Sequence, residues 1–507
     1  MTADVVPGVV AVALVTIATL AIGSYRQRFS RTTSDFFVAS RTVRPALNAS
    51  AIGGEYLSGA SFLGIAGLLL VFGADMLWYP VGFTAGYLVL LVLVAAPLRR
   101  SGAYTLPDFA EARLGSRGVR AACSVLVVAV GWLYLLPQFE GAGLTLSAAV
   151  GAPRWVGAVV VGVVVVVGVG SGGMRAITFV QAFQYWLKLT ALLVPLAVLL
   201  VVWMGDGSPG PVLRTDTAQW SLPLADGGGA GLYATYSLIV ATFLGTMGLP
   251  HVAVRFYTNP DGGAARRTTL VVLVLLGVFY LLPPAYALLG RVYGESLAAA
   301  GRSDVMVLEL PRVMLPGMAG ELLTALVTAG AFAAFLSTSS GLAVAVAGVL
   351  GQDVTGRLPG LAGRRGTLSG VPAFRLGAVI AVAVPLGVSL LVPDLGVARS
   401  VGLAFAMAAS TFCPLLVLGI WWRGLTAPGA VAGLVAGGLG CGGAIVTTFS
   451  PAPVTGWAGV LLEQPAAWSV PLAVLVMVAV SLATRDRVPA HAGRFLVRLH
   501  TPESVRP

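Results

Sequence analysis

The sequence AIGGEYLSGAS, residues 51–61, interrupts a long apolar segment with residues that membrane helices avoid. It contains three glycines, two serines, a tyrosine and the carboxylate of Glu55. A carboxylate near the bilayer centre costs about 2.5–3.5 kcal/mol on insertion scales. Glycine also weakens the helix that hides the backbone from lipid. We therefore predict a membrane helix that is broken and polar near its middle.

The composition supports a membrane location for nearly the whole chain. Of its 507 residues, 57% are hydrophobic and 10% are charged, and the mean hydropathy is +0.91. Soluble proteins carry about 25% charged residues. The chain is therefore predicted to be an all-α polytopic membrane protein whose partner is the lipid bilayer.

The rarer residue types exclude several functions. The only lysine, Lys188, does not belong to a phosphate-binding loop, and the three histidines form no HExxH zinc motif. The three cysteines are far apart and have no metal-ligand spacing. We expect neither an ATP-driven pump nor an enzyme, and no cofactor other than a coupling ion.

About thirteen apolar segments are long enough to span a membrane. The first is not a signal peptide, because its basic cluster follows the apolar run instead of preceding it. The segments are 5–24, 46–72, 75–97, 120–148, 155–171, 179–203, 230–253, 268–290, 319–349, 376–393, 398–421, 426–448 and 466–484.

Charge asymmetry predicts the topology, because cytoplasmic loops are rich in basic residues. With the N-terminus outside, 24 of the 30 arginines fall in cytoplasmic segments. The six outside are Arg154, Arg214, Arg291, Arg302, Arg312 and Arg399. We expect a multi-pass protein of the plasma (inner) membrane with a cytoplasmic C-terminus and a cytoplasmic segment 351–374. The basic residues are spread over many short loops, which argues against nucleic acid as a partner.

A second span is also interrupted. The segment ATFLGTMGLPHVAVRFY, residues 241–257, contains Gly245, Gly248 and Pro250. Proline removes a backbone donor and clashes with the preceding turn. The two broken spans lie five spans apart and so cross in opposite directions, which is typical of a transporter binding site between inverted repeats. The alternative is that these glycines only permit close helix packing.

Several motifs resemble those of the sodium:solute symporter family, and more narrowly its cation/acetate branch. The matching stretches are SDFFVASRTV (34–43), EYLSGASFLGIAG (55–67), YTLPDFAEARL (104–114), QFEGAG (138–143), GTMGLPHVAVRFYT (245–258) and GLAFAMAAS (402–410). The resemblance implies a LeuT-like core of two inverted five-helix repeats with broken helices. Residues 1–45 would then form the first helix and a basic loop, 46–203 and 230–421 the two repeats, and 422–507 two further helices and a cytoplasmic tail.

The resemblance also implies a sodium site. Ser337 and Thr338 match the hydroxyl pair that binds sodium in sodium-coupled members, although acetate symporters have apolar residues there. The backbone carbonyls of Gly54, Leu57 and Ala334 match the remaining ligands. A neutral five-oxygen site of this kind suits sodium as the coupling ion. The alternative is that the hydroxyls only bond the preceding helical turn.

The resemblance to the cation/acetate branch implies that the substrate is a short monocarboxylate such as acetate, propionate or pyruvate. The amides freed by the first break carry positive dipole charge and suit a carboxylate. The residues expected at this site are Tyr56, Ser58, Gly59, Ser61, Phe62, Gln138, Gly245 and Gly248.

Buried acids support a competing hypothesis of proton coupling. Glu55 and Glu140 both fall within spans, where acids often relay protons. Lys188 is expected to snorkel to the cytoplasmic surface. A solute sensor without transport and a channel are further alternatives, and the sequence does not select one monocarboxylate.

Overall fold

The computed structural model describes residues 6–27, 33–211, 220–222, 228–354, 370–391, 396–448 and 454–505. In these residues the protein is built of helices and contains no strand, so the predicted all-α class is confirmed. Part of the segment expected to be cytoplasmic, residues 355–369, lies outside the described ranges.

The N-terminal half holds the first broken span. Its helices are α1 (Val6–Gln27), α2 (Thr33–Val38), α3 (Pro45–Tyr56), α4 (Ile65–Phe72), α5 (Trp78–Val89), α6 (Ala95–Ser101), α7 (Leu106–Leu114), α8 (Arg117–Val150) and α9 (Arg154–Gly205). One-turn π-helices, η3 (Ala60–Gly64) and η5 (Leu90–Val94), lead into α4 and α6.

The C-terminal half holds the second broken span and the closing helices. These are α11 (Gly228–Gly248), α12 (Pro250–Phe256), α13 (Gly262–Tyr280), α14 (Leu282–Tyr293), α15 (Glu295–Ala299), α16 (Met306–Met314), α17 (Met318–Val349), α18 (Val371–Ser389), α19 (Val397–Trp421), α20 (Ala427–Thr448), α21 (Gly456–Glu463), α22 (Ala466–Ala483) and α23 (Ala492–His500). A π-helical turn, η7 (Leu350–Val354), extends α17.

Eleven helical stretches in the described residues are long and apolar enough to cross a membrane. This number does not confirm the thirteen expected spans. Two of the stretches, however, contain 42 and 52 residues, whereas one crossing needs about 20. The longer of them, α9, bends sharply at Gly173, whose φ of 57° is left-handed. A Cβ at this glycine would lie 2.6 Å from the Phe36 ring, so only glycine fits the bend.

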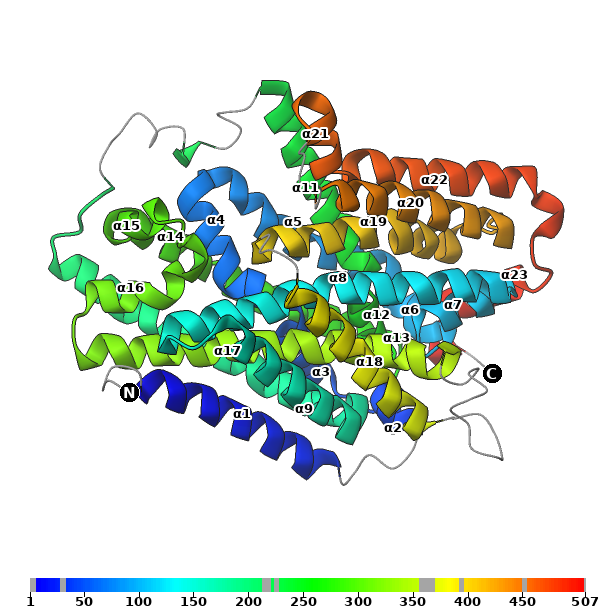
Figure 1. The fold of residues 1–507 in the computed structure, drawn as a ribbon. Coiled ribbons are helices and arrows are strands. Elements are labelled where there is room, and N and C mark those ends of the chain that lie inside the picture. The colour runs from blue at the N-terminus through cyan, green and yellow to red at the C-terminus, as the bar shows by residue number, and fades with distance from the viewer. Residues whose placement is uncertain are drawn as a thin grey trace.

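Helix α17 forms the centre of the molecule and α1 lies at its edge (Figure 1). The membrane-spanning part of α17 is buried throughout, because its many alanines and glycines let α8, α9 and α18 pack closely around it. The long helices run roughly side by side, and α1 begins at the end of the molecule opposite to α23 (Figure 1). This arrangement brings the middle of α17 against the first broken span.

Candidate functional site

The first broken span releases backbone carbonyls in the protein interior. Helix α3 ends at Tyr56, and Leu57 has a non-helical ψ of 82°. The amide of Ser58 donates to the Tyr56 carbonyl (2.8 Å) and that of Gly59 to Gln138 Oε1 (3.4 Å). In an unbroken helix these two amides would bond the carbonyls of Gly54 and Glu55. The break therefore frees the polar groups predicted from the sequence.

The second break lies at Leu249, between α11 and α12. Leu249 is extended, with φ −67° and ψ 121°, and Pro250 opens α12. A Cβ on Gly245 would lie 2.4 Å from the Phe405 carbonyl oxygen, and one on Gly248 would lie 2.3 Å from that of Ala408. These two predicted substrate residues thus allow α11 to pack closely on α19, as the packing alternative expects.

A buried ion pair joins the two broken spans. Arg255 Nε on α12 lies 2.6 Å from Glu55 Oε2 on α3, and both side chains are almost fully buried. Arg255 Nη1 also donates to Thr178 Oγ1 (2.9 Å). Gly341 leaves the room for the carboxylate, because a Cβ there would lie 2.1 Å from Glu55 Cδ. Arg255, expected in a cytoplasmic segment, therefore lies within the protein.

The prediction for Lys188 is wrong. Its side chain is fully buried, and its ammonium donates to the Gly54 carbonyl and to the Leu57 carbonyl (2.7 Å). The physical reason is the length of the helix. Lys188 lies fifteen residues beyond the Gly173 kink, or roughly 22 Å along the helix. From that depth it cannot reach the cytoplasmic surface.

Helix α17 brings the predicted hydroxyl pair to the same place. Thr338 Oγ1 donates to the Glu55 carbonyl (2.7 Å), so all three freed carbonyls, those of Gly54, Glu55 and Leu57, accept a side-chain donor. Ser337 Oγ is buried and has no hydrogen-bond partner among the described residues. Ala334, one turn earlier, is also buried.

These residues do not fit a bound sodium ion while Lys188 is in place. Two of the five predicted ligands, the carbonyls of Gly54 and Leu57, already accept hydrogen bonds from the ammonium. A sodium ion among the remaining oxygens would lie beside a unit positive charge of the same sign.

The predicted substrate residues surround the first break and pack against aromatic side chains. Tyr56 Oη lies 2.6 Å from Thr246 Oγ1, so it contacts the second broken span. Ser61 Oγ lies 3.0 Å from Tyr280 Oη. Phe62 packs against Phe279 at a centroid distance of 6.4 Å. The space beside Gly59 is filled by Phe335, whose ring would lie 2.0 Å from an added Cβ.

His251 completes this region and was not predicted from the sequence. It follows the proline of the second break, and its ring makes an edge-to-face contact with Tyr134 at a centroid distance of 5.4 Å. Within the described part of the chain, neither ring nitrogen of this buried histidine has a hydrogen-bond partner. The signal that could have identified it is the polar residue directly after Pro250.

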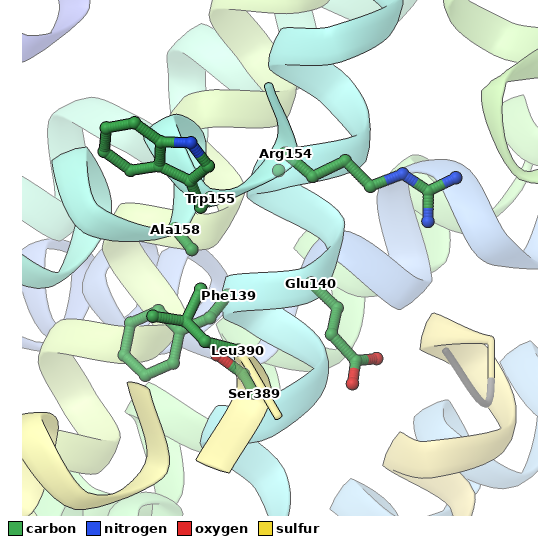
Figure 2. A pocket seen from close by; sticks show the side chains of 8 residues that line it. Phe139, Glu140, Arg154, Trp155, Ala158, Ser389 and Leu390 are labelled. Atoms are coloured by element: carbon green, nitrogen blue, oxygen red, sulfur yellow. The ribbon is translucent and has the colours of Figure 1, made fainter. Parts of the chain in front are cut away.

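The second acid of the proton hypothesis lies elsewhere. Glu140 lines a separate pocket between α8, α9 and the end of α18, together with Arg154, Trp155 and Ser389. Its side chain points away from that of its neighbour Phe139 (Figure 2). The structure therefore brings Glu55, but not Glu140, to the junction of the broken spans.

The two broken helices lie within an all-helical membrane fold of the LeuT type. A family model described as the Sodium:solute symporter family matches residues 36–437. The chain belongs to this family.

Two curated relatives are similar along most of their length. The uncharacterized symporter YwcA of Bacillus subtilis is 30% identical over 482 residues, which cover 90% of each chain. The monocarboxylic acid transporter of Corynebacterium glutamicum is 32% identical over 480 residues, covering 87% of this chain and 84% of the relative.

Solved structures support the fold. A Na⁺-coupled sialic acid symporter in a substrate-bound, outward-open state has a TM-score of 0.70 at 14% identity, covering 93% of this chain and 98% of that chain. MhsT in complex with L-phenylalanine has a TM-score of 0.54 at 15% identity, covering 87% of this chain and 98% of that chain. At these identities the similarity concerns the fold alone.

Proposed function

We propose that the protein is a cation-coupled symporter that takes up a short monocarboxylate such as acetate, propionate or pyruvate. The similarity to a monocarboxylic acid transporter over 87% of the chain supports the substrate class. The observation that carries the proposal is the pair of breaks, which place polar backbone groups and the unpartnered ring of His251 inside the protein next to a buried ion pair.

His251 is our candidate for the group that binds the carboxylate. An imidazole can donate one N–H and accept at the other nitrogen. A buried polar group without a partner is costly, so a ligand that supplies the partner binds favourably. The surrounding rings of Tyr134 and Phe405 give the mostly apolar lining that small-molecule sites have. A two- or three-carbon acid fits this site chemically, because its carboxylate can bond the imidazole and its short apolar part can contact the rings.

The coupling ion is a separate question. The hydroxyl pair of Ser337 and Thr338 supports sodium as the coupling ion, whereas Glu55 is the central candidate for proton coupling. The ion pair with Arg255 favours a structural role for Glu55, since the arginine already neutralises its charge. The contacts of Lys188 with the carbonyls of Gly54 and Leu57 argue against a sodium ion at this position.

Uptake of labelled acetate into proteoliposomes that contain the purified protein tests the proposal. We expect accumulation driven by an imposed cation gradient, with competition by propionate and pyruvate but not by the uncharged acetamide. Saturable binding without uptake would indicate a solute sensor, and neither binding nor uptake of any short acid would refute the substrate class.

The His251→Phe variant tests the binding site within the same assay. Losing a hydrogen bond to a charged ligand costs about 1.5–3 kcal/mol, so acetate affinity should fall about ten- to hundredfold. Phenylalanine keeps the ring that contacts Tyr134, which limits damage to packing. Unchanged affinity in a folded variant would place the carboxylate elsewhere.

A further inference from the structure

The carbonyls freed by the first break form an acceptor site for a single positive charge. Carbonyl oxygens suit small cations, and transporters use unwound backbone for this purpose. Here the described cation is the ammonium of Lys188, which bonds the carbonyls of Gly54 and Leu57 in the interior. The same two carbonyls are those that the family resemblance assigns to sodium.

Close helix packing positions the ammonium. A Cβ on Gly54 would lie 2.1 Å from the Gln181 carbonyl oxygen and 3.3 Å from Ser337 Oγ. Helices α3, α9 and α17 therefore meet at Gly54. The residue of α9 at this contact, Gln181, lies two turns before Lys188. The lysine stem is long enough to bring its charge to the carbonyls but is enclosed on every side, since its exposed fraction is 0%.

Among the described residues, the ammonium bonds carbonyls and no carboxylate. Glu55 on α3 is paired with Arg255 on α12, so these two side chains cancel each other. The other ionisable groups of these helices that lie buried near the breaks are Tyr56 on α3, Tyr185 on α9 and His251 on α12. Helices packed against them add the buried Tyr87, Tyr134 and Tyr280. Helix α17 contributes the hydroxyls of Ser337 and Thr338. With Lys188 protonated, the junction holds one net positive charge, which equals and opposes that of a monocarboxylate.

We propose that Lys188 is a built-in substitute for the coupling sodium ion, so that monocarboxylate binding needs no sodium at this position. The inference rests on the proposed function for its substrate, but its central claim concerns the cation site alone. Two like unit charges about 4 Å apart in a protein repel enough to weaken ion binding about a thousandfold. Sodium is therefore excluded as long as the ammonium remains.

A matched pair of variants tests the substitution. Lys188→Ala removes the charge and leaves space beside Gly54, Leu57, Ser337 and Thr338, so sodium can enter. Lys188→Met removes the charge but fills much of the space. We expect thermal unfolding of the parent to be the same in sodium and choline chloride. Sodium should raise the unfolding temperature of Lys188→Ala, because an ion that binds only the folded state stabilises it. Lys188→Met should not respond.

Acetate binding provides the second measurement. In Lys188→Ala, affinity should fall about ten- to hundredfold in choline and recover in sodium, as expected for loss of an opposite charge about 6–12 Å from the carboxylate. Adding Ser337→Ala and Thr338→Ala to Lys188→Ala should abolish the recovery. Lys188→Met should stay weak in both salts.

The outcomes separate the two proposals. The inference would be overturned if acetate binding by the parent requires sodium and Ser337→Ala/Thr338→Ala removes this effect of sodium. This test holds even if Lys188→Ala fails to fold. A folded Lys188→Ala that ignores sodium would overturn it as well. If the sodium effects on unfolding follow the expected pattern but no short acid binds, the cation substitution stands and the substrate assignment fails.

Discussion

At the scale of single residues, the junction of the broken spans depends on a buried ion pair. Glu55 and Arg255 come from positions 200 residues apart and meet at 2.6 Å. Burying either charge alone would be expensive, because desolvation is repaid only when the partner is present. The pair therefore holds the two breaks at a fixed distance and gives the site its shape.

Removing one member of this pair should be strongly destabilising. We expect Glu55→Gln to lower the free energy of unfolding by about 3–5 kcal/mol, since it leaves the Arg255 charge buried and unpaired. The double variant Glu55→Gln/Arg255→Met should recover much of this loss. Thermal unfolding in detergent measures both. A stable Glu55→Gln whose uptake has lost its pH dependence would instead support Glu55 as a proton carrier.

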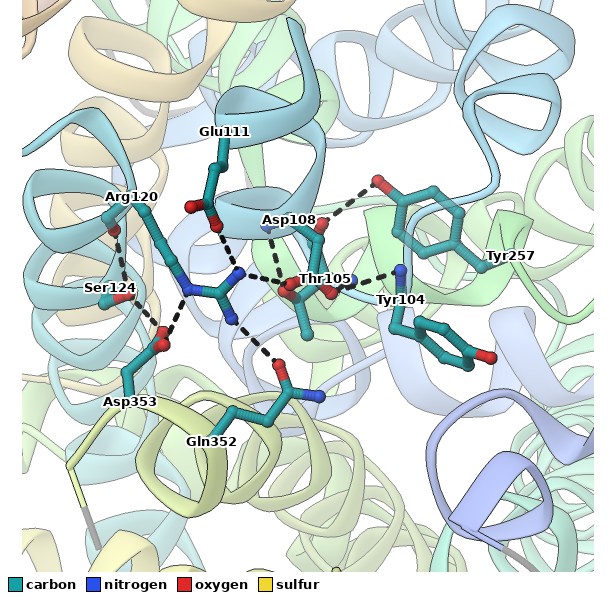
Figure 3. Close-up of polar contacts among 9 residues, drawn as sticks. All are labelled: Tyr104, Thr105, Asp108, Glu111, Arg120, Ser124, Tyr257, Gln352 and Asp353. Atoms are coloured by element: carbon teal, nitrogen blue, oxygen red, sulfur yellow. Dashed lines mark hydrogen bonds and ion pairs between the residues drawn. The ribbon is translucent and has the colours of Figure 1, made fainter. Parts of the chain in front are cut away.

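At the scale of helices, a polar cluster at the end predicted to be cytoplasmic ties α7, α8 and the end of α17 together (Figure 3). Arg120 at the start of α8 lies 2.8 Å from Asp108 and 2.7 Å from Glu111, both on α7. Its Nε lies 2.6 Å from Asp353 in η7, which also accepts from Ser124. Because α17 carries Ser337 and Thr338 at its middle, one helix links this cluster to the cation site.

Loss of the cluster should loosen this end of α17. The Arg120→Met variant leaves three partly buried carboxylates close together, and we expect a loss of about 1–3 kcal/mol in stability. Amide exchange in residues 350–353 should speed up, as hydrogen–deuterium exchange would show. The exposed pair Arg399–Glu463, at 3.3 Å, provides a control. Glu463→Gln should change stability by less than about 0.5 kcal/mol. Equal effects of the two variants would contradict a linking role for Arg120.

The helices themselves were largely predictable, whereas the contacts between them were not. Both breaks follow from local chemistry, because Gly53, Gly54 and Pro250 weaken a helix wherever they stand. The apolar segments 155–171 and 179–203 place a boundary near the bend at Gly173. Lys188 lies deeper than expected because the second helix begins directly after the bend and not at residue 179. Its acceptors lie 131 and 134 residues away. Pairings over such distances are fixed by tertiary packing, so the sequence could indicate polar groups but not their partners.

At the scale of the whole molecule, the described helices place the beginning and end of the chain at opposite ends (Figure 1). An odd number of crossings requires this arrangement, and the excess of arginine on one side predicts which end is cytoplasmic. Helix α15 then lies outside and the turn between α22 and α23 lies inside. The two faces can be distinguished at exposed positions in the described residues, namely Ser296 and Asp486.

Cysteine labelling tests this topology with little background, because the native Cys123, Cys413 and Cys441 are all buried. An impermeant maleimide added to intact cells should label Ser296→Cys and leave Asp486→Cys unmodified. After permeabilisation, both variants should react to a similar extent, which controls for local accessibility. Labelling of only Asp486→Cys in intact cells would invert the orientation. Labelling of both in intact cells would place the two positions on one side, which the odd number of expected crossings between Ser296 and Asp486 does not allow.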